Sequence, residues 1–290
     1  MSERDIVSPH TRQHVQLNGR DLAYRELPGS GIPVLLIHGI ALNLDTWDDL
    51  PERLSTRGIP VLAVDLPGHG ESSKGPGDYS LGSMASTLRD LLDNHGIDRV
   101  HLVGHSLGGG VSMQFAYQFP DRVASMILES SGGLGEEAFT GLRAAALPGS
   151  ELAIKWAINQ RTLAGASWLG AKLSRVGVTP HMLSPRTLQT VSWLGEDDRR
   201  AAFLATLRSV VSPRGQRVSA LDKLHLMEGS RVLIVWGDRD PMIPMGHGQA
   251  AHELLSGSRF VVFPGAGHEP HTHDPERFAA LVAEHVGSHP

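Results

Sequence analysis

The chain has 290 residues, 40% hydrophobic and 20% charged, which is typical of a folded globular protein and not of a disordered one. Its net charge of −5 gives no reason to expect nucleic acid or an anionic membrane as a partner. The absence of cysteine excludes disulfides, thiolate catalysis and cysteine metal sites. Because no signal-peptide pattern and no run of roughly 18 apolar residues is present, we expect a cytoplasmic protein without stable membrane insertion.

The first predicted elements are two strands joined by a tight turn. Residues 14–17 and 20–27 flank the pair Asn18-Gly19, which is typical of two-residue β-hairpins. Further along the chain, short runs that are nearly continuous in apolar residues are typical of strands buried on both faces of a sheet. These runs lie at residues 33–39, 59–68, 99–106, 122–131, 230–238 and 258–268.

Helical patterns lie between most of these predicted strands. From Ser80 onward, apolar residues recur at three- and four-residue spacing until Gly96, which predicts an amphipathic helix. Near the C-terminus, Asp274 is the predicted N-cap of a helix with Pro275 and Glu276 in its first turn. The alternation of strands and helices predicts an α/β fold with a parallel sheet and right-handed crossovers.

The alternation breaks between about residues 133 and 212. This stretch has a helical character and no clear buried strand, and roughly eighty residues is far too long for an ordinary loop. We therefore predict a helical cap at residues 133–212, inserted into an α/β core formed by residues 1–132 and 213–290.

The sequence VGHSLGGG at residues 103–110 places one serine among four glycines. Gly104, Ser106 and Gly108 form a G-x-S-x-G pattern between a predicted strand and a predicted helix. Small flanking residues let the strand and helix pass closely and leave the serine Oγ exposed on a strained turn, while the helix N-terminus favours developing negative charge. A serine here could instead only cap the helix, but the strand–turn–helix context favours a nucleophile.

With this turn in place, the sequence resembles the α/β-hydrolase fold superfamily from about residue 15 to residue 286. The motifs that carry the resemblance, in the family's order, are HGIALNLDTW (38–47), DLPGHGESS (65–73), GHSLGG (104–109), WGDRDPMIP (236–244) and GAGHEPHTHDP (265–275). Within the superfamily, residues 104–123 are most similar to actinobacterial esterase- and lipase-like serine hydrolases with a helical cap. The resemblance implies a mostly parallel sheet flanked by helices.

The resemblance also implies a catalytic triad. Ser106 would be the nucleophile, His268 the base and Asp240 the acid that orients the base, in the chain order that this fold uses. The pattern W-G-x-x-D selects Asp240 rather than Asp238. Glu129 remains an alternative acid, because it ends the strand after the nucleophile helix, where some relatives carry theirs.

Other residues near the triad have expected roles as well. The resemblance implies an oxyanion hole formed by the backbone N–H groups of Ile40 and Leu107. His105 is expected to support the turn. His271 and His273 compete with His268 for the role of base or could form a surface metal pair, but no third ligand is evident. We interpret both as solvated loop histidines and expect no metal and no cofactor.

The predicted cap holds three of the five tryptophans, Trp156, Trp168 and Trp193. They could pack the core of the cap itself, or they could form an apolar wall over the active site and contact the substrate. The sequence leaves both interpretations open.

These features predict a serine hydrolase, carboxylesterase- or lipase-like, whose partner is a small-molecule ester or related acyl substrate with an apolar acyl group. Hydrolysis of a lactone, a thioester or a carbon–carbon bond would use the same triad. A ligand-binding receptor on a hydrolase scaffold is the alternative from another class. The natural substrate and a possible homodimer stay open.

Overall fold

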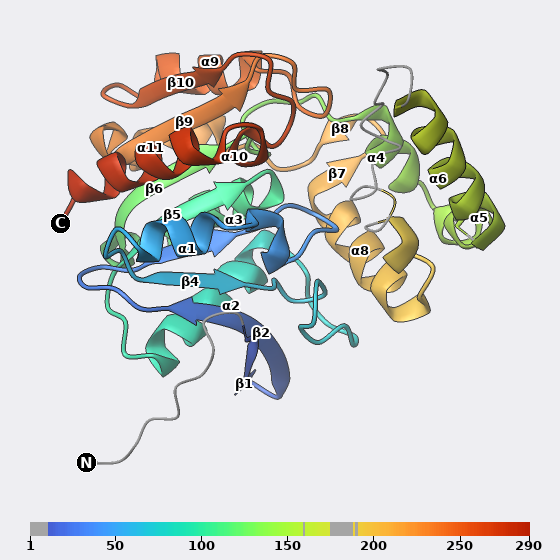
Figure 1. Ribbon diagram of the computed structural model, residues 1–290, viewed down its shortest axis with the longest axis horizontal. Coiled ribbons are helices and arrows are strands. Elements are labelled where there is room, and N and C mark those ends of the chain that lie inside the picture. Colours follow the sequence, from blue (N-terminus) through green and yellow to red (C-terminus); the bar gives the residue numbers. More distant parts are fainter. Residues whose placement is uncertain (1–10, 159, 175–187, 189–190) are drawn as a thin grey trace.

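The structure is a computed structural model, and it describes residues 11–158, 160–174, 188 and 191–290. A sheet with the strand order β1-β2-β4-β3-β5-β6-β9-β10 forms its centre (Figure 1). Its strands are β1 (Gln13–Leu17), β2 (Arg20–Leu27), β3 (Val34–Ile37), β4 (Val61–Val64), β5 (Val100–His105), β6 (Val123–Glu129), β9 (Val232–Gly237) and β10 (Arg259–Phe263). All eight coincide with predicted strands.

Pairing in the sheet follows the expected pattern. β1 and β2 form an antiparallel hairpin through Asn18 and Gly19, both at positive φ, and β2 also pairs antiparallel with β4. The other pairs are parallel. Every residue of β3, β4, β5, β6 and β9 is buried, which is why these strands have continuous apolar sequences. The predicted α/β fold with a mostly parallel sheet is confirmed.

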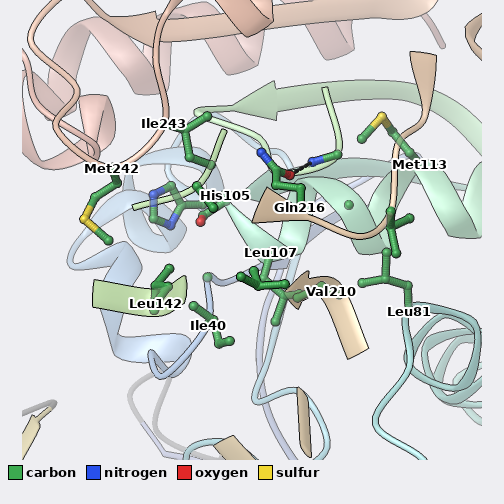
Figure 2. A pocket seen from close by; sticks show the side chains of 18 of the residues that line it. Ile40, Leu81, His105, Leu107, Met113, Leu142, Val210, Gln216, Met242 and Ile243 are labelled. Atoms are coloured by element: carbon green, nitrogen blue, oxygen red, sulfur yellow. Dashed lines mark hydrogen bonds between the residues drawn. The ribbon is translucent and has the colours of Figure 1, made fainter. Parts of the chain in front are cut away.

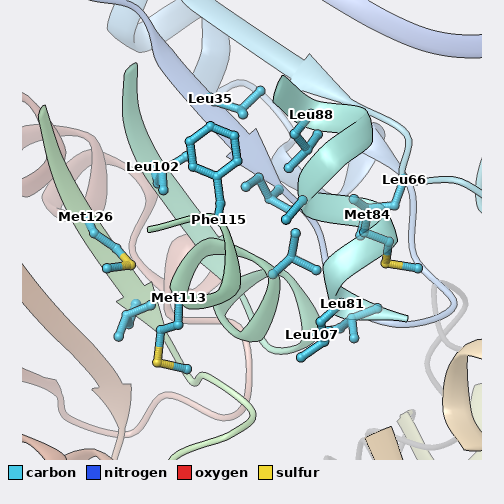
Figure 3. Packing of buried hydrophobic residues seen from close by; sticks show 14 of the residues in the cluster. Leu35, Leu66, Leu81, Met84, Leu88, Leu102, Leu107, Met113, Phe115 and Met126 are labelled. Atoms are coloured by element: carbon cyan, nitrogen blue, oxygen red, sulfur yellow. The ribbon is translucent and has the colours of Figure 1, made fainter. Parts of the chain in front are cut away.

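Helices cover both faces of this sheet and form two apolar clusters. They are α1 (Leu50–Ser55), α2 (Leu81–Asn94), α3 (Leu107–Gln118), α9 (Gly246–Leu254), α10 (Pro270–His273) and α11 (Pro275–Gly287). On one face, Leu88 of α2 and Phe115 of α3 pack with Leu102 of β5, as Figure 3 shows. On the other face, Phe278 of α11 packs with Val103 of β5, because neighbouring strand residues point to opposite faces.

The predicted helix ends are confirmed at two caps. Ser80 accepts a hydrogen bond from the N–H of Ser83 at the start of α2, and Asp274 accepts one from the N–H of Arg277 at the start of α11. α2 ends at Asn94, and Gly96 follows at a φ of 64°. Short 3-10 helices complete the connections, at Leu44–Trp47, Pro120–Arg122, Leu221–Leu226 and Gly229–Arg231.

Residues 133–212, called the inserted segment below, contribute most of the elements between β6 and β9. They are α4 (Thr140–Ala145), α5 (Ser150–Ala157), α6 (Gln160–Ser174), α8 (Asp197–Val210) and β7 (Val211–Ser212), and β7 pairs with β8 (Gly215–Gln216). The helices lie beyond the carboxyl ends of the parallel strands (Figure 1). The hairpin β7–β8 was not predicted, because two-residue strands are too short to show a pattern, and the predicted boundary at residue 212 falls within it.

In the part of the chain that the structure describes, no helix combines the length and the apolar character that a membrane crossing requires.

Candidate active site

Ser106 is the single residue between β5 and α3. Its backbone has φ 55° and ψ −113°, a conformation that costs a non-glycine residue on the order of 1–3 kcal/mol. Hydrogen bonds from the surrounding backbone hold this turn: the N–H of Ser106 donates to the carbonyl of Glu129 at 2.9 Å, and its carbonyl accepts from the N–H of Gly132 at 2.9 Å. The predicted strand–turn–helix around Ser106 is therefore present and rigidly held.

The glycines on either side of Ser106 are required by close packing. A Cβ atom added to Gly104 would overlap the backbone of Gly108, and one added to Gly108 would overlap the carbonyl of Ile37 in β3. By contrast, a Cβ on Gly110 would meet its nearest neighbour, a methyl group of Leu81, at 3.5 Å, which is an ordinary contact. Two of these glycines thus let α3 approach the sheet closely, and Gly110 does not serve that purpose.

His268 and Asp240 form a buried pair at the carboxyl ends of the parallel strands, where Ser106 also lies. His268 Nδ1 lies 2.8 Å from Asp240 Oδ2, and the other oxygen of Asp240 accepts hydrogen bonds from the N–H groups of Met242 (2.8 Å) and Ile243 (3.0 Å). Burial alone would raise the pKa of Asp240, but its hydrogen bonds and the charge interaction with His268 lower the pKa below its ordinary value. The carboxylate therefore accepts from Nδ1–H, which leaves Nε2 as the ring nitrogen of His268 that can act as an acceptor.

Ser106 and His268 both line a cavity of about 220 Å³ at the carboxyl ends of the strands. The cavity wall is mostly apolar. Figure 2 shows Ile40, Leu142 and Met242 on one side of Leu107, and Leu81 and Met113 on the other. A carbonyl group beside Ser106 would therefore sit in low-polarity surroundings, where charge interactions are stronger than in water.

Ile40 and Leu107, the two expected oxyanion donors, both line this cavity. Within the described residues, no turn, loop or side chain accepts a hydrogen bond from the N–H of either one. Leu107 begins α3, so its N–H has no partner inside the helix either. Both N–H groups are thus available as donors.

Buried polar side chains fix the loop that carries Ile40. His38 Nδ1 donates to the carbonyl of Gly39 at 2.7 Å, and its Nε2 accepts from the N–H of Leu66 at 3.0 Å. Asp65 accepts a hydrogen bond from the N–H of Leu44 at 2.7 Å. Because burial lowers the pKa of His38 to about 4, its imidazole is neutral and can make both bonds.

Glu129, the alternative acid, is paired with a different histidine. One of its oxygens accepts from the N–H of His271 at 2.8 Å, and His271 Nδ1 lies 2.8 and 2.9 Å from its two oxygens. His271 Nε2 lies 3.0 Å from the carbonyl oxygen of Thr46. Burial alone would lower the pKa of His271, but Glu129 and the carbonyl of Thr46 raise it, because both ring nitrogens face acceptors.

The interpretation of His271 as a solvated loop histidine is wrong, because His271 is only 3% exposed. The short helix α10 turns its side chain inward, toward the end of β6, and the sequence carried no signal of this turn. His273, two residues later, is exposed as expected. No group of three or more histidine or carboxylate side chains in the described ranges is arranged to bind a metal ion.

His105 lies between the two histidines of the last loop. Its ring centroid is 4.8 Å from that of His268 and 5.5 Å from that of His271. Its Nε2 donates to the carbonyl of His268 at 2.9 Å, and burial lowers its pKa to about 4, so it is neutral. His105 thus holds the backbone of His268 in addition to ending β5.

The structure does not bring the three tryptophans of the inserted segment to the cavity. Trp156 and Trp168 are 82% and 65% exposed, and among the described residues neither belongs to an apolar core cluster or to the cavity lining. Trp193 is partly buried, with the guanidinium of Arg199 over its ring. The described residues of the inserted segment that line the cavity are Gly133, Ala138, Phe139, Leu142, Leu207, Val210 and Val211. The spacing of apolar residues along α8 shows which face of the helix is apolar. It does not show that this face lines the cavity, which is why these lining residues were not predicted.

The profile of the α/β hydrolase fold family matches residues 32–275, and the chain belongs to this family. A protein of Mycobacterium tuberculosis described as uncharacterised is 42% identical, over 95% of this chain and 81% of that one. Two relatives with described activities are a pimeloyl-[acyl-carrier protein] methyl ester esterase of Neisseria meningitidis (29% identical, 90% and 79% covered) and a 2-hydroxy-6-oxo-6-phenylhexa-2,4-dienoate hydrolase of Comamonas testosteroni (26%, 97% and 98%). A hydrolase structure from Pseudomonas aeruginosa has a TM-score of 0.74 at 25% identity, with 97% of this chain and 100% of that one covered.

Proposed function

We propose that this chain is a serine hydrolase that cleaves a carboxylic ester through an acyl-enzyme. The observation that carries the proposal is that Ser106, on a strained turn, lines the same cavity as His268, whose other ring nitrogen is bonded to the buried Asp240. A nucleophile, a base and an acid that orients the base are the minimum for this chemistry.

In the proposed reaction, the Oγ of Ser106 attacks the ester carbonyl while Nε2 of His268 takes its proton. Asp240 stabilises the imidazolium, and the N–H groups of Ile40 and Leu107 donate to the oxyanion, which contributes several kcal/mol to the transition state. His268 then protonates the departing alcohol. Water, activated by the same base, attacks the acyl-enzyme and releases the acid.

The apolar wall of the cavity supports an apolar acyl group, and the inserted segment is proposed to act as a cap over the site. Phe139, Leu142 and Val210 come from this segment, whereas Leu81 and Met113 come from the α/β core. An acyl chain between these walls would lose contact with water on both sides. The esterase from Neisseria meningitidis is a relative consistent with this substrate class.

Hydrolysis of a carbon–carbon bond is a second candidate. The hydrolase from Comamonas testosteroni, whose name places it in this class, matches this chain over almost its full length. The two activities are separated by comparing turnover of 4-nitrophenyl octanoate with turnover of a 2-hydroxy-6-oxo-2,4-dienoate. A larger kcat/KM for the dienoate would replace the ester as the proposed substrate.

An organophosphonate probe tests the nucleophile. We expect mass spectrometry to place the adduct on Ser106, and Ser106→Ala to lose both labelling and ester turnover. Ser219, a second serine that lines the cavity, provides the matched control, since Ser219→Ala should still be labelled at Ser106. An adduct on another residue, or tight binding of an ester without turnover, would contradict the proposal, and the second result would favour a ligand-binding protein.

A further inference from the structure

The cavity continues along α3, away from Ser106. Leu107, Gly110, Gln114 and Tyr117 all line it, at the three- and four-residue spacing of a single helix face. Tyr117 follows Ser106 by eleven residues, which corresponds to about 16 Å along the helix axis. The catalytic serine is therefore at one end of this helix face and Tyr117 is near the other.

The hydroxyl of Tyr117 is a buried donor that no described residue satisfies. It is shielded from solvent, and no hydrogen-bond partner lies within reach. Burial raises the pKa of Tyr117 to about 12, so the group keeps its proton and can only donate to an anion. A buried tyrosine hydroxyl ordinarily has a partner, and at the wall of a substrate cavity the substrate can provide it.

An exposed lysine, Lys223, places a positive charge near the ring of Tyr117. Lys223 also lines the cavity, and its ammonium lies 5.8 Å from the centre of the Tyr117 ring. Among the described residues, no carboxylate is within ion-pair distance of Lys223. At the catalytic end the charge has the opposite sign, because Glu269 lines the cavity directly after His268. An anionic group is thus favoured at the Tyr117 end and disfavoured beside the serine.

We propose that Tyr117 and Lys223 bind a carboxylate at the far end of the acyl group, so that the substrate is a monoester of a dicarboxylic acid. This proposal rests on the ester hydrolysis proposed above. Side chains on a helix generally lean toward its N-terminus, which shortens the span between the two ends of this helix face, and an acyl chain of roughly six to eight carbons would suit it. A neutral chain of this length would fit the apolar wall but leave the hydroxyl unpaired.

The test compares two esters that differ only at the far end of the acyl chain. One is the mono-4-nitrophenyl ester of octanedioic acid, and the other is its analogue with a methyl ester in place of the free carboxylate. We expect kcat/KM to favour the free carboxylate by roughly ten-fold, because hydrogen bonds to charged groups contribute more than those to neutral ones. Tyr117→Phe and Lys223→Met should each reduce this ratio to below about three-fold.

The control is Lys172→Met, which removes the same charge from an exposed residue of α6 that does not line the cavity, and it should leave the ratio unchanged. Titration calorimetry with the Ser106→Ala variant gives a second readout that is independent of turnover, and the same preference should appear there as a ratio of Kd values. Equal binding of the two esters would overturn the proposal. Ser106 should still be labelled by the phosphonate in that case. The proposed binding of a carboxylate can therefore fail while the proposed serine hydrolase activity remains supported.

Discussion

Two buried carboxylates lie at the carboxyl edge of the sheet, and each is paired with a histidine. Asp240 holds His268, which lines the cavity, whereas Glu129 holds His271, which does not. His105 lies between the two rings. The two carboxylates are therefore expected to differ in function: Asp240 affects the chemistry, and Glu129 ties the last loop to β6 and to the backbone of Thr46.

Asp240→Asn and Glu129→Gln test this distinction. We expect Asp240→Asn to lower kcat/KM by about three to four orders of magnitude, because the amide favours the wrong tautomer of His268. Glu129→Gln should instead destabilise the fold by about 3–5 kcal/mol, because it removes the carboxylate that is paired with the buried ring of His271. Kinetics with a melting curve for each variant separate the two effects. The opposite ranking of the kinetic losses would identify Glu129 as the acid.

The raised pKa of His271 predicts how its contribution to stability depends on pH. A group whose pKa is higher in the folded state stabilises the fold at low pH, and this contribution is lost as pH rises through the folded value. The difference in free energy of unfolding between the unmodified protein and His271→Asn should therefore shrink as pH rises above 6.5. Urea unfolding of both proteins from pH 6 to pH 9 measures it. A difference that grows with pH would mean that His271 is neutral when folded.

At the scale of elements, the strands were predictable because burial on both faces requires a continuous run of apolar residues. The turn after β5 was predictable because its tight geometry requires small residues at neighbouring positions in the sequence. The pairing of Glu129 with His271 was not predictable, because it depends on how α10 folds back over the edge of the sheet. The cavity lining was missed for a similar reason: the tryptophans were considered either as the core of the cap or as an apolar wall over the site, but the wall comes from smaller residues such as Leu142 and Val210. The triad residues were identified through the family resemblance, and their catalytic roles remain predictions.

The packing of α3 against the sheet predicts different outcomes for three nearly adjacent glycine positions. Gly104→Ala and Gly108→Ala should each destabilise the protein by about 1–3 kcal/mol, because the added methyl group overlaps backbone atoms. Gly110→Ala should be neutral or stabilise it by up to about 1 kcal/mol, because alanine favours the helix. Chemical unfolding of the three variants measures these changes. Equal losses at Gly108 and Gly110 would show that the close approach is not the cause.

On the scale of the whole molecule, the proposed site lies where the α/β core meets the inserted segment. The core contributes Ser106, Asp240 and His268, together with the backbone donors, whereas α4 and α8 contribute part of the apolar wall. The proposed chemistry is thus assigned to the α/β core, whereas both parts of the chain contribute to the wall around the acyl group. Substitutions in the inserted segment should then change which ester is preferred without removing the triad.

This division predicts a dependence on acyl chain length. Because each buried methylene contributes roughly 0.8 kcal/mol, we expect kcat/KM for neutral 4-nitrophenyl esters to rise about ten-fold or more from acetate to a chain of six to eight carbons. Leu142→Ala and Val210→Ala should flatten this rise, since both residues line the cavity. Trp168→Ala is the matched control, because Trp168 is 65% exposed and lies outside the lining. Its chain-length profile should match that of the unmodified protein.

The outcome that would contradict this assignment is a flat profile in the unmodified protein, or a profile that changes with Trp168→Ala and not with Leu142→Ala. A flat profile would mean that the apolar wall is not in contact with the acyl group during the reaction, and a small lactone would then be the better substrate to test. A response to Trp168 alone would require α6 to reach the cavity when substrate binds. The melting temperature of each variant is measured as well, because a partly unfolded variant could also show a flattened profile.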